Sequence, residues 1–90
     1  MKEDLLKIIQ HYGIMPQLKY FQSEVFELNE SIIKEQYGED DINHIAEEIA
    51  DVQVMLNQFK EYYVITNREI EEVMKYKVER QLDRIKCESI

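Results

Sequence analysis

Apolar residues in the middle of this chain recur at alternating intervals of three and four residues, and no other feature of the sequence limits the fold as strongly. The run comprises Ile42, Ile45, Ile49, Val52, Leu56 and Phe59. Such spacing places side chains along one stripe of an α-helix, whereas a strand would need apolar residues at every second position. An earlier run has the same spacing and comprises Leu18, Phe21, Val25, Leu28 and Ile32. The sequence therefore predicts two long amphipathic helices in succession.

Glycine and proline residues separate these runs from their neighbours. Gly13 and Gly38 suit helix ends, where a left-handed backbone is common. Pro16 suits the first turn of a helix, because the N–H that it lacks would have no partner there. We therefore expect a short helix from about Lys2 to His11 and a long one from about Pro16 to Gln36.

Two further helix starts carry capping signals. The acidic run at residues 39–41 favours the start of a third helix, because carboxylates cap free N–H groups and interact well with the helix dipole. Thr66 and Glu69 form a capping box, which predicts that a fourth helix starts at Asn67. A few residues around Gly38 join the second and third helices, so these two should fold back as an antiparallel hairpin.

The fold class follows from length and composition. Ninety residues form one domain, 1–90, and two glycines with one proline are too few for a β-fold with many tight turns. We expect an all-α four-helix bundle with a central antiparallel hairpin. Apolar residues outside the stripes predict a homodimer or homotetramer, because one small chain cannot cover them. They are Tyr20, Phe26, Ile33, Tyr62, Tyr63 and Tyr76.

Charge and cysteine content limit the partners. A formal net charge of −8 argues against general nucleic-acid binding, because it repels polyphosphate. No apolar run is long enough to span a membrane. The single cysteine, Cys87, cannot form an internal disulfide, and the amino-terminal residues do not form a signal peptide. A cytoplasmic protein without membrane or nucleic-acid partners is therefore expected.

Two acidic pairs lie in the predicted hairpin. Glu24 and Glu27 fall on the second helix, and Glu48 and Asp51 fall on the third. Each pair is offset from its apolar stripe in the same rotational sense, and the pairs lie at similar distances from Gly38. If the two stripes face each other, all four carboxylates converge on one side of the hairpin.

Converging carboxylates need a cation among them, because their charges otherwise repel. Oxygen ligands favour Mg²⁺, Mn²⁺ or Ca²⁺ over zinc. The same pairs are also common on solvated helix faces, and that interpretation stays open. Asp41 and His44 have the acid-x-x-His spacing of di-iron bundles, but no second copy of the element exists. We expect His44 to lie exposed near a helix start, and His11 near a helix end.

The pattern Glu-x-x-Glu, followed about twenty residues later by Glu-x-x-Asp, resembles the MazG-type all-α nucleoside triphosphate pyrophosphohydrolases. Gln17 ahead of the first pair and the phrase Glu47-Glu48-Ile-Ala-Asp51-Val52 add to the resemblance, which covers roughly residues 15–84. The resemblance implies Mg²⁺-dependent hydrolysis of a nucleoside triphosphate between the α and β phosphates, with Mn²⁺ as a possible substitute. It also implies that Glu24, Glu27, Glu48 and Asp51 are the metal ligands and catalytic residues. Which of them accepts the proton of the attacking water stays open.

Phosphate and base contacts are expected elsewhere in the chain. Lys77, Arg80 and Arg84 share one flank of the fourth helix and are candidates for phosphate binding, although a solvated basic ridge would look the same. The resemblance implies a base pocket built from the early helices, where Gln17 is a candidate along with Tyr20 and Phe21. For Phe21, packing in the core is the competing interpretation.

Two other functions remain compatible with these residues. A non-enzymatic helical interaction module would also be amphipathic and oligomeric, but it would have no use for four carboxylates at one level. A related enzyme could act on phosphoribosyl-ATP, dUTP or dCTP, because base selection depends on contacts that the sequence does not reveal.

Overall fold

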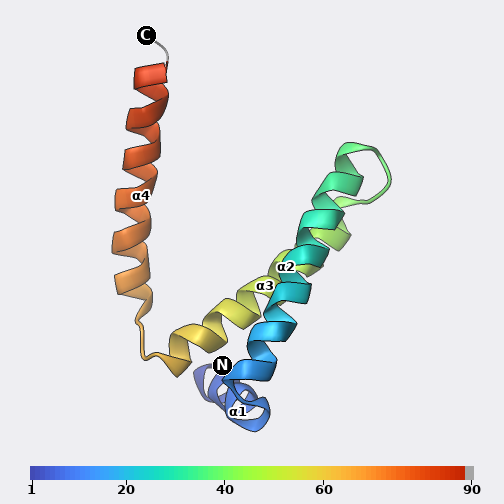
Figure 1. Cartoon of the computed structure of the whole chain (residues 1–90), viewed down its shortest axis with the longest axis vertical. Coiled ribbons are helices and arrows are strands. Elements are labelled where there is room, and N and C mark those ends of the chain that lie inside the picture. The colour runs from blue at the N-terminus through green and yellow to red at the C-terminus, as the bar shows by residue number, and fades with distance from the viewer. Residues whose placement is uncertain (89–90) are drawn as a thin grey trace.

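The chain folds into four α-helices, and the residues that the structure describes, 1–88, contain no strand. The structure is a computed structural model (Figure 1). The helices are α1 (Lys2–Tyr12), α2 (Ile14–Gln36), α3 (Ile42–Tyr62) and α4 (Asn67–Glu88). The all-helical class predicted from the apolar spacing is confirmed. The last two residues of the predicted domain, 1–90, lie outside the described part.

Glycine forms the turns at both ends of α2. Gly13 has a φ of 89°, and its N–H donates to the Ile9 carbonyl over 2.8 Å, which ends α1. Helix α2 begins immediately afterwards, two residues before Pro16, so this proline does fall in the first turn. Gly38 has a φ of 74° in the connection to α3. A residue with a Cβ would be strained at either position.

The capping residues act as the sequence predicts. Asp41 precedes α3, and its carboxylate accepts the N–H of His44 over 2.8 Å. At the start of α4, the Thr66 hydroxyl accepts the N–H of Glu69 over 3.1 Å, and the Glu69 carboxylate accepts the N–H of Thr66 over 2.8 Å. Each pair satisfies N–H groups that lack partners inside the helix.

Helices α2 and α3 form the predicted antiparallel hairpin, and α1 packs against both of them at the end opposite their connecting turn (Figure 1). Leu5 and Ile9 of α1 and Met55 of α3 are the buried apolar residues of the described chain. The apolar core is therefore small and lies where α2 begins and α3 ends, away from the turn at Gly38.

The two helices of the hairpin meet along a more polar face than the stripes predict. The buried residues of α2 are Gln17, Glu24 and Ser31, which recur every second turn. Leu18, Val25 and Ile32 occupy the next positions along the helix and are each 41% exposed. An apolar stripe of this width is broader than one neighbouring helix can cover. One side of the apolar stripe on α2 therefore stays exposed. On α3, Ile49 and Leu56 are exposed as well.

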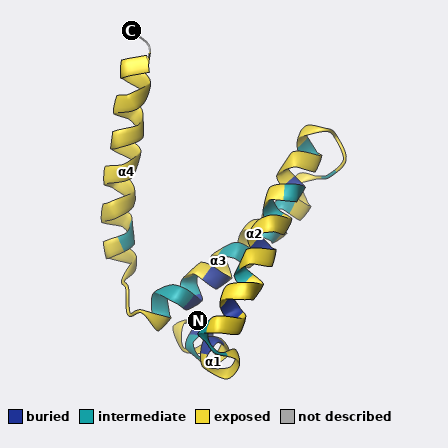
Figure 2. Ribbon diagram, in the orientation of Figure 1, coloured by how far each residue is buried: buried dark blue, intermediate teal, exposed yellow. Residues whose placement is uncertain are grey.

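Helix α4 stands apart from the other three (Figures 1 and 2). It packs along none of them within the described chain, and none of its described residues is buried. Only its start lies near α3, where the Lys60 ammonium donates to Asn67. The apolar residues Val73, Met74, Val78 and Leu82 are exposed. A single chain thus packs three helices together, and the expected four-helix arrangement is not completed within it.

Across the described residues, no helix combines the length and the apolar character needed to cross a bilayer.

Candidate metal site and the adjoining cavity

Three acidic side chains meet where α2 crosses α3. Glu24 and Glu27 lie one turn apart on α2, and Glu48 lies opposite them on α3. Each offers one carboxylate oxygen, and these three oxygens all lie within 4.8 Å of one another. The helical spacing within α2 and the fold-back at Gly38 together bring them to the same level of the hairpin.

Burial makes this cluster different from an ordinary acidic surface. Glu24 is only 5% exposed, and the Glu48 side chain is 12% exposed. Glu24 Oε2 and Glu48 Oε2 are buried and have no hydrogen-bond partner among the described residues. A buried carboxylate oxygen without a partner is costly, because it has lost its hydration without gaining a donor. A cation placed among these three carboxylates could satisfy both oxygens.

The donor set suits a hard divalent cation. All three side chains contribute oxygen, which Mg²⁺, Mn²⁺ and Ca²⁺ prefer, and no sulfur ligand is present in the cluster. Glu27 is exposed, so one side of the cluster is open to solvent or to a further ligand. Mg²⁺ usually keeps several water molecules and binds substrate phosphates at such open positions.

Asp51, the fourth predicted ligand, lies outside this group of three. It is exposed and sits one turn further along α3, where it lines an adjoining cavity. Tyr20 lies on the same side: a hydrogen bond to Glu24, the negative charge of Glu24, and the charges of Asp51 and Glu27 raise the pKa of its hydroxyl. The Tyr20 phenol and the Asp51 carboxylate thus connect the acidic cluster to the cavity.

His44 contacts the cluster from the start of α3. Its Nε2 lies 3.2 Å from Glu48 Oε1, and its Nδ1 lies 2.7 Å from Asp40 Oδ2. The hydrogen bond to Asp40 raises the pKa of His44, and the charges of Asp40 and Glu48 add to this effect, although the partial desolvation of the ring opposes it. His44 is exposed near a helix start, as expected, but its contact with Glu48 was not predicted. The signal was available, because His44 precedes Glu48 by four residues and therefore shares its helix face.

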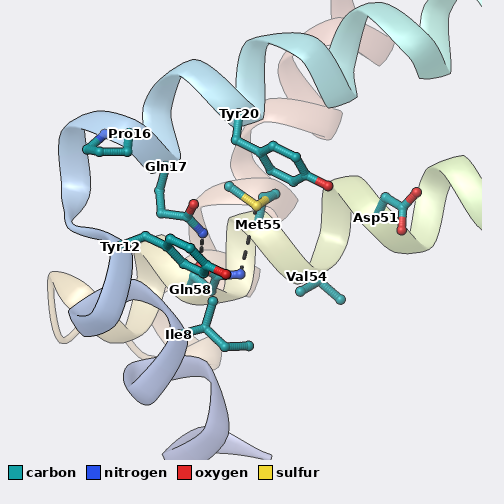
Figure 3. A pocket seen from close by; sticks show the side chains of 9 residues that line it. All are labelled: Ile8, Tyr12, Pro16, Gln17, Tyr20, Asp51, Val54, Met55 and Gln58. Carbon is teal, nitrogen blue, oxygen red and sulfur yellow. Dashed lines mark hydrogen bonds between the residues drawn. The ribbon is translucent and has the colours of Figure 1, made fainter.

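The cavity beside the acids has a volume of about 540 Å³ (Figure 3). This is within the range of small-molecule sites. Helices α1, α2 and α3 all contribute to its wall, through Ile8, Tyr12, Pro16, Gln17, Tyr20, Asp51, Val54, Met55 and Gln58. The wall is mostly apolar, and its polar groups come from Tyr12 on α1 and from side chains of α2 and α3. In Figure 3 the Tyr20 hydroxyl points toward Asp51, and the side chains of Gln17 and Gln58 meet next to Tyr12.

A buried pair of amides forms the inner end of this cavity. Gln17 Nε2 donates to Gln58 Oε1 over 2.8 Å, and Gln58 Nε2 donates to the Met55 sulfur over 3.8 Å (Figure 3). Gln17, a candidate for base binding, thus lines this cavity. Gln58 was missed, because a single glutamine on a helix has no distinctive spacing.

Phe21 does not line this cavity. Its ring packs edge-on against Phe59 of α3, with ring centroids 5.3 Å apart. This contact favours the packing interpretation over a role in base binding.

The three basic residues predicted to contact phosphate lie away from the acids within one chain. Lys77, Arg80 and Arg84 line a shallow hollow on α4 together with Gln81. They do share one flank of the helix, as their spacing indicates. The acidic cluster is on α2 and α3, against which this part of α4 does not pack.

Comparisons of the chain with protein-family models, with curated proteins and with solved structures found no match.

Proposed function

We propose that this protein is a divalent-cation-dependent hydrolase that cleaves a nucleoside triphosphate between its α and β phosphates, releasing the monophosphate and pyrophosphate. The observation that carries the proposal is the pair of buried, partnerless oxygens on Glu24 and Glu48 beside a cavity of small-molecule size. The resemblance of the acidic motif to the MazG-type enzymes supports the reaction type. Fit of the donor set to Mg²⁺ or Mn²⁺ supports the choice of cation.

In this proposal, Glu24, Glu27 and Glu48 hold the cation, and Asp51 adds a carboxylate from the cavity side. A bound cation supplies charge neutralisation for the phosphates and lowers the pKa of a coordinated water. The protein's own groups position the reaction: the rigid hairpin holds the carboxylates at one level, and the buried wall excludes water from one side. A carboxylate of this set accepts the proton of the attacking water.

The cavity is the proposed site for the nucleoside. Its position next to Asp51 would place a base among apolar side chains while the phosphates lie at the acidic cluster. Gln17 and Gln58 offer amide groups that can pair with the polar edge of a base. The Tyr20 ring lies between the two regions and can contact the sugar.

We further propose that the active form is a homodimer or homotetramer. Two exposed apolar surfaces support this assembly: the open side of the hairpin stripe, represented by Val25 and Leu56, and the face of α4 that carries Val78 and Leu82. Burying them against a second copy would remove both from water. Lys77, Arg80 and Arg84 would then contact phosphate from a neighbouring copy rather than within their own chain.

The decisive experiment is a substrate panel. Purified protein is incubated with Mg²⁺ or Mn²⁺ and each ribo- and deoxyribonucleoside triphosphate, including dUTP and dCTP, and with phosphoribosyl-ATP. The proposal expects monophosphate and pyrophosphate in equal amounts, and no activity in the presence of a chelator. Glu48→Gln should abolish turnover, whereas Glu30→Gln is a matched control, because Glu30 forms only an exposed ion pair with Lys34 on α2. Release of orthophosphate, or equal activity of both variants, would contradict the proposal.

A helical interaction module remains the second candidate, because α4 offers an exposed amphipathic surface of the kind that binds partner helices. The two functions differ in their need for a cation. A module would keep its partner binding in Glu24→Gln and Glu48→Gln, and the wild-type chain would bind no Mn²⁺ at the cluster.

A further inference from the structure

His44 joins two carboxylates along the start of α3. Asp40, His44 and Glu48 follow one another at intervals of four residues, so their side chains form a ladder on one helix face. Nδ1 of the ring lies 2.7 Å from Asp40 Oδ2, and Nε2 lies 3.2 Å from Glu48 Oε1. Both ring nitrogens thus face carboxylate oxygens.

The Asp40 end of this ladder is firmly held. Asp40 Oδ1 accepts the backbone N–H of Asp41 over 2.8 Å, and the Asp40 side chain is only 13% exposed. Ser31, a buried residue of α2, has its hydroxyl 3.5 Å from His44 Nδ1. Ser31 of α2 and Asp40, which precedes the α3 cap, therefore hold the imidazole ring in place.

The Glu48 end of the ladder separates the two oxygens of one carboxylate. Oε1 lies against His44 Nε2, whereas Oε2 is buried and has no partner in the described chain. A glutamate side chain has several rotatable bonds, and a cation site needs them fixed in one conformation. A hydrogen-bond donor that contacts one carboxylate oxygen fixes the side chain and leaves the other oxygen available to bind a cation.

We propose that His44 is a positioning residue for the cation site: Asp40 anchors its ring, and the ring holds Glu48 Oε1 so that Glu48 Oε2 stays free to bind the cation. This inference rests on the proposed metal-dependent function. His44 touches neither cation nor substrate, and it acts only through Glu48. Comparable hydrogen bonds to metal ligands change metal affinity by roughly 10- to 100-fold.

The test exploits the shapes of two amides. In place of a histidine, the side-chain nitrogen of glutamine lies near the position of Nε2, and that of asparagine near Nδ1. His44→Gln therefore keeps a donor for Glu48, whereas His44→Asn keeps only one for Asp40. Mn²⁺ affinity is measured from the electron paramagnetic resonance signal of free Mn²⁺, with wild type, both amide variants and His44→Ala. His11→Ala, on α1, controls for loss of an exposed histidine.

The inference expects Mn²⁺ binding to weaken roughly 10- to 100-fold in His44→Ala and His44→Asn, and to stay within a few-fold of wild type in His44→Gln and His11→Ala. Circular dichroism confirms that each variant keeps its helices. Unchanged affinity in His44→Ala, or rescue by asparagine but not by glutamine, would overturn the positioning role and leave the metal site standing. Absence of Mn²⁺ binding by the wild-type chain would overturn both the metal site and this inference.

A measurement on the metal-free chain distinguishes a role in positioning Glu48 from a role in the folding of the whole chain. Scalar couplings in nuclear magnetic resonance spectra report the χ1 rotamer of Glu48 in the metal-free chain. A single rotamer is expected in wild type and His44→Gln, and rotamer averaging in His44→Asn. Averaging in the wild-type chain would contradict the proposal.

Discussion

The hairpin of α2 and α3 and the helix α4 distribute their polar and apolar residues in opposite ways. The hairpin buries Glu24, Gln17 and Gln58 at the contact between its helices and leaves part of its apolar stripe exposed. Helix α4 buries none of its described residues, and its apolar residues Val73, Met74, Val78 and Leu82 are exposed. Stability alone would favour the reverse arrangement, because burial of carboxylates and amides is costly and burial of apolar groups is favourable.

This contrast indicates different roles for the two regions. In the hairpin, buried polar groups gather on the side that carries the acidic cluster and the cavity, which is expected where burial serves chemistry. In α4, the amphipathic pattern has no counterpart within the same chain. A helix of this kind gains most of its stability from packing, so its exposed apolar residues support the homo-oligomer that we propose.

The largest expected effect concerns the buried charge of Glu24. Glu24→Leu should lower turnover roughly 10²-fold or more, because the cation loses a ligand. In the absence of metal, the same change should raise the free energy of unfolding by about 1–3 kcal/mol, because it removes a buried oxygen without a partner. Steady-state kinetics and urea unfolding in the presence of a chelator measure both. If the metal-free variant were less stable than wild type, the Glu24 carboxylate would stabilise the hairpin. That result would contradict the view that its burial is costly.

A smaller effect is expected for the exposed face of α4. Leu82→Glu should weaken self-association roughly 10- to 100-fold, because burial of a leucine contributes about 1.5–3 kcal/mol. Sedimentation equilibrium over a range of concentrations measures the change. Cys87→Glu, which adds the same charge on the opposite, exposed side of α4, should leave association nearly unchanged. A wild-type chain that stays monomeric at micromolar concentration would contradict the role given to α4.

The buried amides of the hairpin should respond more weakly. Gln58→Leu leaves the Gln17 amide without its acceptor and should lower the free energy of unfolding by about 1–3 kcal/mol. It should also change the relative KM values of the nucleotides in the panel, because the inner wall of the cavity loses a polar group. Gln53→Leu, at an exposed position of α3, is the control. A loss of stability with unchanged nucleotide preference would limit the amide pair to a structural role.

The smallest effect is expected for the N-terminal cap of α4. Thr66→Ala removes the hydroxyl that caps α4 and should cost about 1 kcal/mol, felt mainly as faster hydrogen exchange in α4. The amides of α2 and α3 should be unaffected, because α4 does not pack along them in one chain. Faster exchange throughout the hairpin would show that α4 is coupled to it, for example through a second copy.

Local signals in the sequence were sufficient for the helices and for part of the site. The spacing of three and four residues, the glycines and the capping box act over a few residues. The four helix starts and the ends of the first two helices are therefore predicted to within a few residues. Glu24, Glu27 and Glu48 were identifiable because angular offset and distance from Gly38 follow from helix geometry alone. Convergence of all four acids assumed that the stripes face each other directly. The helices instead meet on their more polar side, and Asp51 lies at the cavity, outside the group of three.

The amino-acid sequence by itself determined that this protein is helical, where its helices begin, and which acids share a face. Only the tertiary structure decided that Glu24 and Glu48 each keep one buried oxygen without a partner in the described chain. It also decided that His44 contacts Glu48, that Gln58 lines the cavity, and that α4 stands apart. The physical reason is that helix formation depends on neighbours along the chain. The rotation of one helix against another depends on all of their packed side chains at once.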